Sequence, residues 1–164
     1  QVCPNAQRVE IVFREAKADV TRYSIDLLNK PERYASRVNP TCKVPAVVYG
    51  SPKSDSENPS PESARIIQSL VLLEFVADLY PDSGLLPNDP IERAHVRVFI
   101  DAVFIDAVST KVFPRGESPD AFIAAVAELQ LLPPAAQFAI GDHFTIADAA
   151  LAPFLGRWEQ LSAT

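Results

Sequence analysis

The stretch CPNAQRVEIVFREAK, residues 3–17, determines how the rest of the chain is interpreted. Its apolar residues recur at helical spacing and predict a buried face made of Val9, Val12, Phe13 and Ala16. The charged residues, Arg8 among them, are expected largely on the other faces. Pro4 suits the first position of a helix, because the N–H that it lacks would have no partner there. Cys3 is therefore expected at the N-cap.

A cysteine at a helix start can act as a nucleophile. The free N–H groups and the positive end of the helix dipole stabilise a thiolate, so we expect the Cys3 sulfur to accept N–H bonds. Arg8 lies more than one turn away and is expected to help weakly at most. Ala6 stands where a Cys-x-x-Cys motif has its second thiol, so a mixed disulfide on Cys3 needs an outside thiol such as glutathione. An inert cysteine before a helix would fit the same spacing.

The first half then alternates between strands and helices. Residues 20–27 (VTRYSIDL) have the β-branched and aromatic alternation of a strand, and residues 31–38 form a short helix opened by proline. Residues 43–49 (KVPAVVY) predict a second strand, followed by a loop over 50–61 that is rich in Ser and Pro. A long helix is expected from Pro61 or Glu62 to about residue 79.

The second half is expected to be entirely helical. Residues 81–90 (PDSGLLPNDP) contain three prolines and a glycine, which indicates a boundary between two units. After it, helical patterns cover residues 91–112, 120–131 and 145–161. The second half also repeats FIDAV in tandem over residues 99–108, by chance, by local duplication or by an error in the sequence.

Composition limits the kind of protein. Of the 164 residues, 48% are apolar and 22% charged, and no apolar run has the roughly 20 residues that a membrane span needs. The net charge of −6 without a long basic run argues against nucleic acid as a partner. Two cysteines do not make a secreted disulfide framework, so a reducing, cytoplasmic setting is expected. Two histidines and two cysteines without close spacing predict no metal site.

Several motifs together carry a family resemblance. They are CPNAQR (3–8), Asn39-Pro40, Lys43-Val44-Pro45, Glu62-Ser63, the segment 69–94 and GDHFTIADAALAP (141–153). In this order and spacing they resemble a glutathione transferase, most of all the omega class in its fungal branch with a catalytic cysteine.

The resemblance implies an α/β plus all-α architecture. Residues 1–80 would form a thioredoxin-like glutathione-binding domain, whose first strand is absent from this sequence and is expected before it. Residues 81–88 would be the linker, and residues 89–164 an all-helical domain that forms the pocket for a second substrate. In the last segment, Thr145 and Asp148 match the family's capping box, a folding element.

The resemblance also assigns the glutathione site. Cys3 would be the catalytic nucleophile, and the backbone of Val44, before a cis Pro45, would pair with the cysteinyl unit of glutathione. Glu62 and Ser63 would hold the γ-glutamyl end at a helix start, where ordinary capping is the alternative role. Lys43 would lie close to the carboxylates of the ligand.

The implied activity is thiol transfer with glutathione as co-substrate. The class points to deglutathionylation and to reduction of disulfides or glutathionyl ketones, by an enzyme that acts in detoxification. A peroxidase or a dehydroascorbate reductase could use the same thiol. The alternative from another class is a ligandin-type carrier of aromatic or polyphenolic compounds. A small apolar or aromatic second substrate and a homodimer are expected, with no nucleic acid or membrane as partner.

A few other residues are candidates for a functional role. Cys42 is a possible resolving thiol or a small, partly buried residue, and His95 could face substrate or solvent. His143 is expected in a loop. The aromatic residues Phe99, Phe104, Phe113 and Trp158 could line an apolar pocket or belong to the core.

Overall fold

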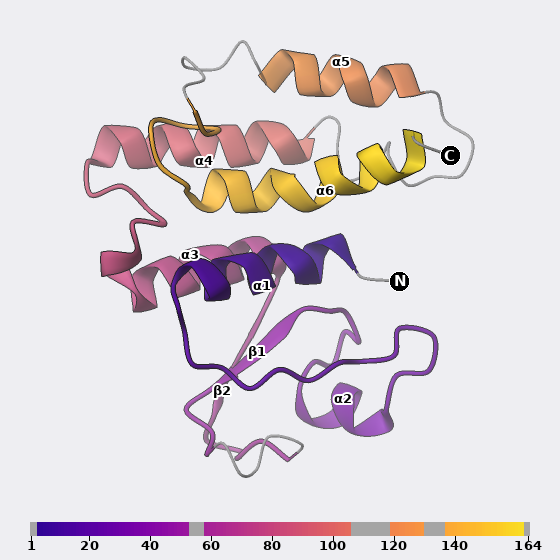
Figure 1. Cartoon of the computed structure of the whole chain (residues 1–164). Coiled ribbons are helices and arrows are strands. Elements are labelled where there is room, and N and C mark those ends of the chain that lie inside the picture. The colour runs from indigo at the N-terminus through magenta and orange to yellow at the C-terminus, as the bar shows by residue number, and fades with distance from the viewer. Residues whose placement is uncertain (1–2, 53–57, 106–118, 130–136, 163–164) are drawn as a thin grey trace.

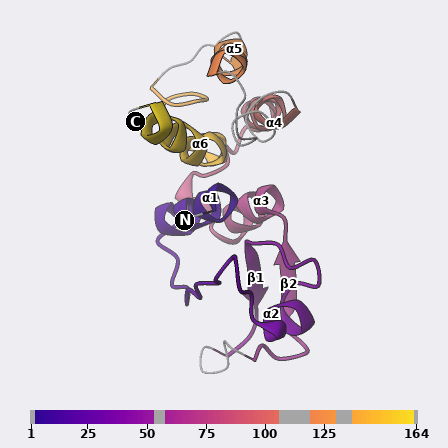
Figure 2. The same cartoon turned by 90° about the vertical axis from the view of Figure 1, so that its right-hand side faces the viewer.

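The computed structural model describes residues 3–52, 58–105, 119–129 and 137–162 (Figure 1). Helices α1 and α3 lie between a small sheet on one side and helices α4 and α6 on the other, which the turned view shows most clearly (Figure 2). Within the described ranges, no helix combines the length and apolar character that crossing a membrane requires.

Helix α1 spans Pro4–Glu15 and begins where the sequence predicts. Cys3 is its N-cap, and the Cys3 carbonyl oxygen accepts hydrogen bonds from the backbone N–H groups of Ala6 and Gln7, at 3.0 and 2.9 Å. The expected buried face is wrong in one respect, because Arg8 is fully buried. Arg8 precedes Val12 by four residues, and residues at that spacing share one face of a helix.

The predicted strand over residues 20–27 is wrong. The segment is a loop, and Val20 and Tyr23 expose 48% and 44% of their surface. A strand requires a partner that bonds its N–H and C=O groups, and among the described residues only β1 and β2 pair as strands. The alternating pattern was present, but no neighbouring strand pairs with it.

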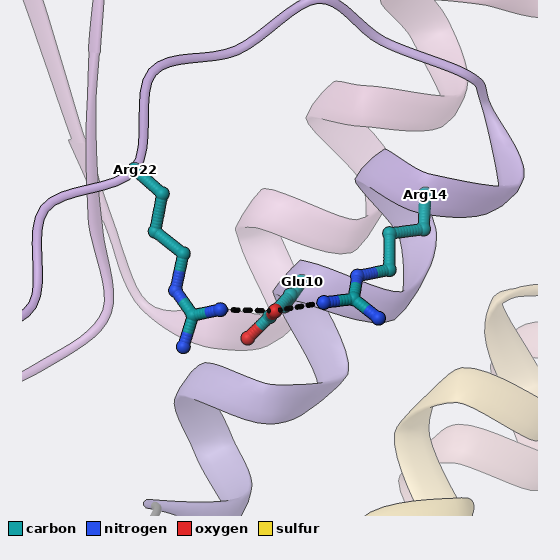
Figure 3. Close-up of polar contacts among 3 residues, drawn as sticks. All are labelled: Glu10, Arg14 and Arg22. Atoms are coloured by element: carbon teal, nitrogen blue, oxygen red, sulfur yellow. Dashed lines mark hydrogen bonds and ion pairs between the residues drawn. The ribbon is translucent and has the colours of Figure 1, made fainter.

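An ion-pair cluster holds this loop against α1 (Figure 3). The Oε1 atom of Glu10 accepts hydrogen bonds from Arg14, at 2.7 Å, and from Arg22, at 2.6 Å. Both arginines are largely exposed, so each pair contributes at most about 1 kcal/mol. The cluster therefore links the loop to α1 but adds little to the free energy of unfolding.

The connection to the sheet follows the prediction. Helix α2 spans Glu32–Arg37 with Pro31 at its N-cap, and strand β1 spans Ala46–Tyr49. The peptide bond between Val44 and Pro45 is cis, as expected.

The long helix predicted from Pro61 or Glu62 begins later. Strand β2, Ala64–Ile67, comes first and pairs antiparallel with β1, so that Ala46 lies opposite Ile67 and Val47 opposite Ile66. Helix α3 follows over Ser69–Leu79. A short apolar run fits a strand or a helix equally well, and pairing with β1 decided it.

The described elements of the second half are all helices, joined by turns and loops. A 3₁₀ turn, η2, spans Pro81–Ser83, and helices α4, α5 and α6 span Pro90–Ile105, Pro119–Leu129 and Ile146–Ser162. The predicted ends of the first two long helices, at residues 112 and 131, and the last part of the FIDAV repeat lie outside the described residues.

One continuous core joins the two halves. Helix α1 packs on α3 and α6, and α4 also packs on α6. Buried apolar residues from these helices form a single cluster that includes Val12, Val76, Val96 and Ile146. The division into residues 1–80 and 89–164 stays a prediction, since this core crosses the expected linker.

The start of α6 is fixed by the expected capping box. The carboxylate of Asp148 accepts hydrogen bonds from the Thr145 N–H and hydroxyl, at 2.9 and 3.2 Å, and from the Ala139 N–H at 2.7 Å. The Thr145 hydroxyl oxygen accepts in turn from the Ala147 N–H at 3.2 Å. Thr145 and Ile146 are fully buried here, so the box closes the core at this end of α6.

Replacing Asp148 with alanine removes three hydrogen bonds at once. We expect the free energy of unfolding to fall by about 2 kcal/mol, since these bonds satisfy partly buried donors. Urea denaturation at neutral pH measures it. Asp142→Ala, at an exposed position in the preceding turn, is the control and should change stability by less than about 0.5 kcal/mol. Equal losses in both variants would contradict the role of the box.

Candidate functional site

A cavity of about 1010 Å³ brings part of the predicted site together. It is lined by α1, the loop after α1 and strand β1, and its wall includes Cys3, Val44 and Pro45. Apolar side chains such as Phe13 and Phe75 line it further along. The start of α1 and the loop before β1 therefore face one space, although about 40 residues separate them.

Cys3 is half-buried at the N-cap of α1 and forms no disulfide. Its side chain makes no capping hydrogen bond, so the expected N–H bonds to sulfur are wrong. Pro4 offers no N–H, and the Ala6 N–H is bonded to the Cys3 carbonyl. Stabilisation of a thiolate here would come from the helix dipole and from neighbouring charge.

Two buried side chains donate hydrogen bonds to the backbone of the loop that carries Val44. The Lys43 carbonyl accepts hydrogen bonds from the Tyr34 hydroxyl and from Nδ2 of Asn39, both at 2.7 Å. The Asn39 Oδ1 atom accepts from the N–H and hydroxyl of Thr41, at 3.0 and 2.9 Å. Asn39, only 1% exposed, thus fixes both ends of the turn that leads to Val44.

The Tyr34 hydroxyl stays a donor over the whole physiological range. Its pKa is raised, chiefly because burial disfavours the phenolate, with Cys42 adding to the rise and Asn39 partly opposing it. A protonated phenol can donate to the Lys43 carbonyl, whereas a phenolate would repel it.

The remaining predicted ligand residues do not line this cavity. Lys43 and Glu62 are exposed, and Ser63 is buried at 6% exposure. No described group bonds the Ser63 hydroxyl oxygen. Glu62 and Ser63 precede strand β2 and do not open a helix, so the argument from a helix N-terminus does not apply to them.

The helix predicted to begin at Pro61 or Glu62 is α3, which begins at Ser69 with Gln68 as its N-cap. Helices α1 and α3 pack side by side, and both run from right to left in Figure 1. Gln68 has φ 74°, a conformation that costs energy in a non-glycine residue and is often found at binding sites. The strand-forming pair Ile66-Ile67 was the signal that could have located this boundary.

The other candidate residues that the structure describes lie in the core or outside the cavity wall. Phe99 is a core residue, and Trp158 is partly buried against the core. Cys42 and His95 are half-buried outside the cavity wall, and His143 is exposed. The side chains of Phe104 and Phe113 lie outside the described residues.

No group of three His, Cys, Asp or Glu side chains in the described ranges is arranged to hold a metal ion.

Variants of the two donors to the Lys43 carbonyl test whether Tyr34 and Asn39 stabilise the loop together. Tyr34→Phe should lower the free energy of unfolding by about 1 kcal/mol, because one donor is lost while Asn39 still satisfies the acceptor. Combined with Asn39→Ala, the loss should exceed the sum of the single losses, since the carbonyl is then without a donor. Urea unfolding of all three variants measures this. Tyr23→Phe, at an exposed tyrosine, is the control, and additive losses would refute the shared role.

Comparison with known proteins agrees with this architecture. Residues 2–79 match the family model for the N-terminal domain of glutathione S-transferase. A probable glutathione S-transferase of Coccidioides immitis is 30% identical, over 89% of this chain and 71% of that protein.

Solved structures extend the match over both halves. Glutathione transferase Omega 2C of Trametes versicolor is 52% identical, with a TM-score of 0.84 over 95% of this chain and 68% of that one. Omega 2S of the same organism, solved with 2,4-dihydroxybenzophenone, is 42% identical, with a TM-score of 0.87 over 98% of this chain and 71% of that one. The expected thioredoxin-like half and helical half are confirmed. The chain belongs to the glutathione transferase family, in its omega class.

Proposed function

We propose that this chain is a glutathione-dependent thiol transferase in which Cys3 is the nucleophile. The observation that carries the proposal is the position of Cys3, at the N-cap of α1 and in one cavity wall with Val44 and the cis Pro45. The family uses glutathione as co-substrate. A thiol, unlike a hydroxyl, can form a disulfide with it, which favours reduction over conjugation.

The reaction proceeds in two exchanges. The Cys3 thiolate attacks the glutathione sulfur of a glutathionylated substrate, so a Cys3–glutathione disulfide forms and the substrate thiolate leaves. A second glutathione thiolate then attacks the glutathione sulfur of that disulfide, which frees Cys3 and yields oxidised glutathione. Each step breaks one S–S bond and makes one, so that overall the incoming glutathione thiol is oxidised to the disulfide level while the substrate sulfur is reduced to a thiol.

The loop before β1 would bind the cysteinyl part of the ligand. The N–H and C=O groups of Val44 can pair with its backbone, in the way that one strand pairs with another. Tyr34 and Asn39 would keep that backbone in place through the Lys43 carbonyl. Lys43 itself, exposed next to Val44, would lie near the carboxylates of the ligand.

We assign the γ-glutamyl end to the start of α3, in place of Glu62 and Ser63. The first N–H groups of a helix have no partner within the helix, and with the positive dipole end they bind a carboxylate well. Ser69 adds a hydroxyl at this point, and Gln68 a carboxamide.

Activity of Cys3 variants tests the chemistry. Cys3→Ser should reduce the turnover of a mixed glutathione disulfide by roughly a thousandfold, because a serine hydroxyl is a poor nucleophile and forms no disulfide. Cys42→Ser should retain turnover. The coupled oxidation of NADPH by glutathione reductase measures both. Full activity of Cys3→Ser would remove the catalytic role.

Glutathione affinity tests the γ-glutamyl assignment. Ser69→Ala should raise the Kd for glutathione about tenfold, since it loses a hydrogen bond to a charged group. Ser63→Ala is the matched comparison, because its hydroxyl is buried before strand β2 and does not lie at a helix start. Isothermal titration calorimetry measures both. The reverse order of effects would restore the assignment to Glu62 and Ser63.

A carrier of aromatic compounds is the second candidate. The neighbour Omega 2S was solved with 2,4-dihydroxybenzophenone, an aromatic ligand of the kind expected here. Binding of such a compound without turnover of any glutathione disulfide would favour the carrier. Parallel assays with peroxide and dehydroascorbate separate the other thiol activities. The homodimer and the cytoplasmic location stay predictions.

A further inference from the structure

A charged side chain is buried where the two halves meet. Arg8, on α1, is 0% exposed, and Phe154, on α6, is 2% exposed. The guanidinium carbon of Arg8 lies over the ring of Phe154, 5.0 Å from its centroid. This is the geometry of a cation–π contact, which is strongest where water is excluded.

The guanidinium is directed towards the first turn of α1. Side chains of a helix point back towards its N-terminus, and Nη2 of Arg8 donates to Oδ1 of Asn5 at 2.5 Å. Asn5 is two residues from Cys3, so this hydrogen bond places the cation at the first turn of the helix that Cys3 caps.

Arg8 carries its charge under physiological conditions. Burial lowers the pKa of its guanidinium to about 10, and the Cys3 thiolate partly opposes this effect. A buried cation of this kind is retained where it has a charged or aromatic partner.

We propose that Arg8 is a positioning residue for Cys3. Held by Asn5 and by the ring of Phe154, its cation stabilises the Cys3 thiolate and makes thiol reactivity depend on how α6 packs against α1. The inference rests on the proposed function only in taking Cys3 as the reacting thiol.

Other charges near Cys3 are differently placed. The charged residues that share the cavity wall with it are Glu10, Arg14, Lys17, Asp19, Arg22 and Arg33. Glu10 is bonded to two of these arginines, which balances its charge. On α6 the nearest charged residue in sequence to Phe154 is Arg157, three positions on. Arg8 does not line the cavity, but its side chain is hydrogen-bonded in the first turn of α1.

The test is the pH profile of Cys3 alkylation in the full chain without glutathione. Iodoacetamide labelling from about pH 5 to pH 9, resolved by peptide mass spectrometry, reports Cys3 and Cys42 separately. The variants are Arg8→Gln, Arg8→Lys, Phe154→Leu and Asn5→Ala. Arg97→Gln removes an exposed arginine that pairs with Glu74 and is the matched control.

In Arg8→Gln the Cys3 profile should move up by about one pH unit, which is a tenfold slower reaction on its acid side. Arg8→Lys should show a smaller shift, since lysine keeps the charge but cannot stack as a planar group. Phe154→Leu and Asn5→Ala should each show part of the shift. The Cys42 profile and the Arg97→Gln variant should be unchanged.

An unchanged Cys3 profile in a folded Arg8→Gln variant overturns the proposal. If that variant does not fold, Phe154→Leu and Asn5→Ala decide, because each leaves Arg8 in place and removes one group that holds it. Unchanged profiles in both overturn it too. Alkylation needs no turnover, so loss of the proposed function would appear separately, as an inactive chain whose Cys3 profile still responds to Arg8.

Discussion

The structure depends on the burial of α1 between the sheet and α6. One face of this helix, with Arg8, Val9 and Val12, is withdrawn from water, and α3 packs beside it. Because the helix is fixed along its length, its first residue is fixed as well, and Cys3 stands there. The same packing that forms the core therefore determines what the thiol faces. Core stability and site geometry are not separable at this helix.

Much of this architecture follows from local sequence patterns. Pro4 marked the start of α1, Thr145 and Asp148 marked the start of α6, and the Val44-Pro45 pair indicated the loop before β1. Each signal works through neighbours in the chain, by a missing donor, a side-chain cap or a restricted backbone. Patterns that depended on distant partners were the ones that failed. Residues 20–27 have the alternation of a strand but no pairing partner among the described residues, and the residues of β2 locally predict a helix because its partner β1 is not local.

The candidate site shows the same limit. Cys3, Val44 and Pro45, which sequence motifs single out, line one cavity in the structure. Ser63 looked suitable by composition, yet its hydroxyl is buried before a strand. The sequence predicts Arg8 on an outer face of α1, because arginine is usually exposed. The ring of Phe154, about 146 positions later, lies against the buried guanidinium, and no local pattern predicts that contact.

The double role of Glu10 has a consequence for the cavity wall. Its two arginine partners are mostly in water, where dissolved ions weaken such pairs over a screening length of about 8 Å at physiological ionic strength. Most contacts of α1 with α3 and α6 are apolar and buried, and these respond little to ions. The loop beside the cavity is thus held to α1 in part by contacts that salt weakens.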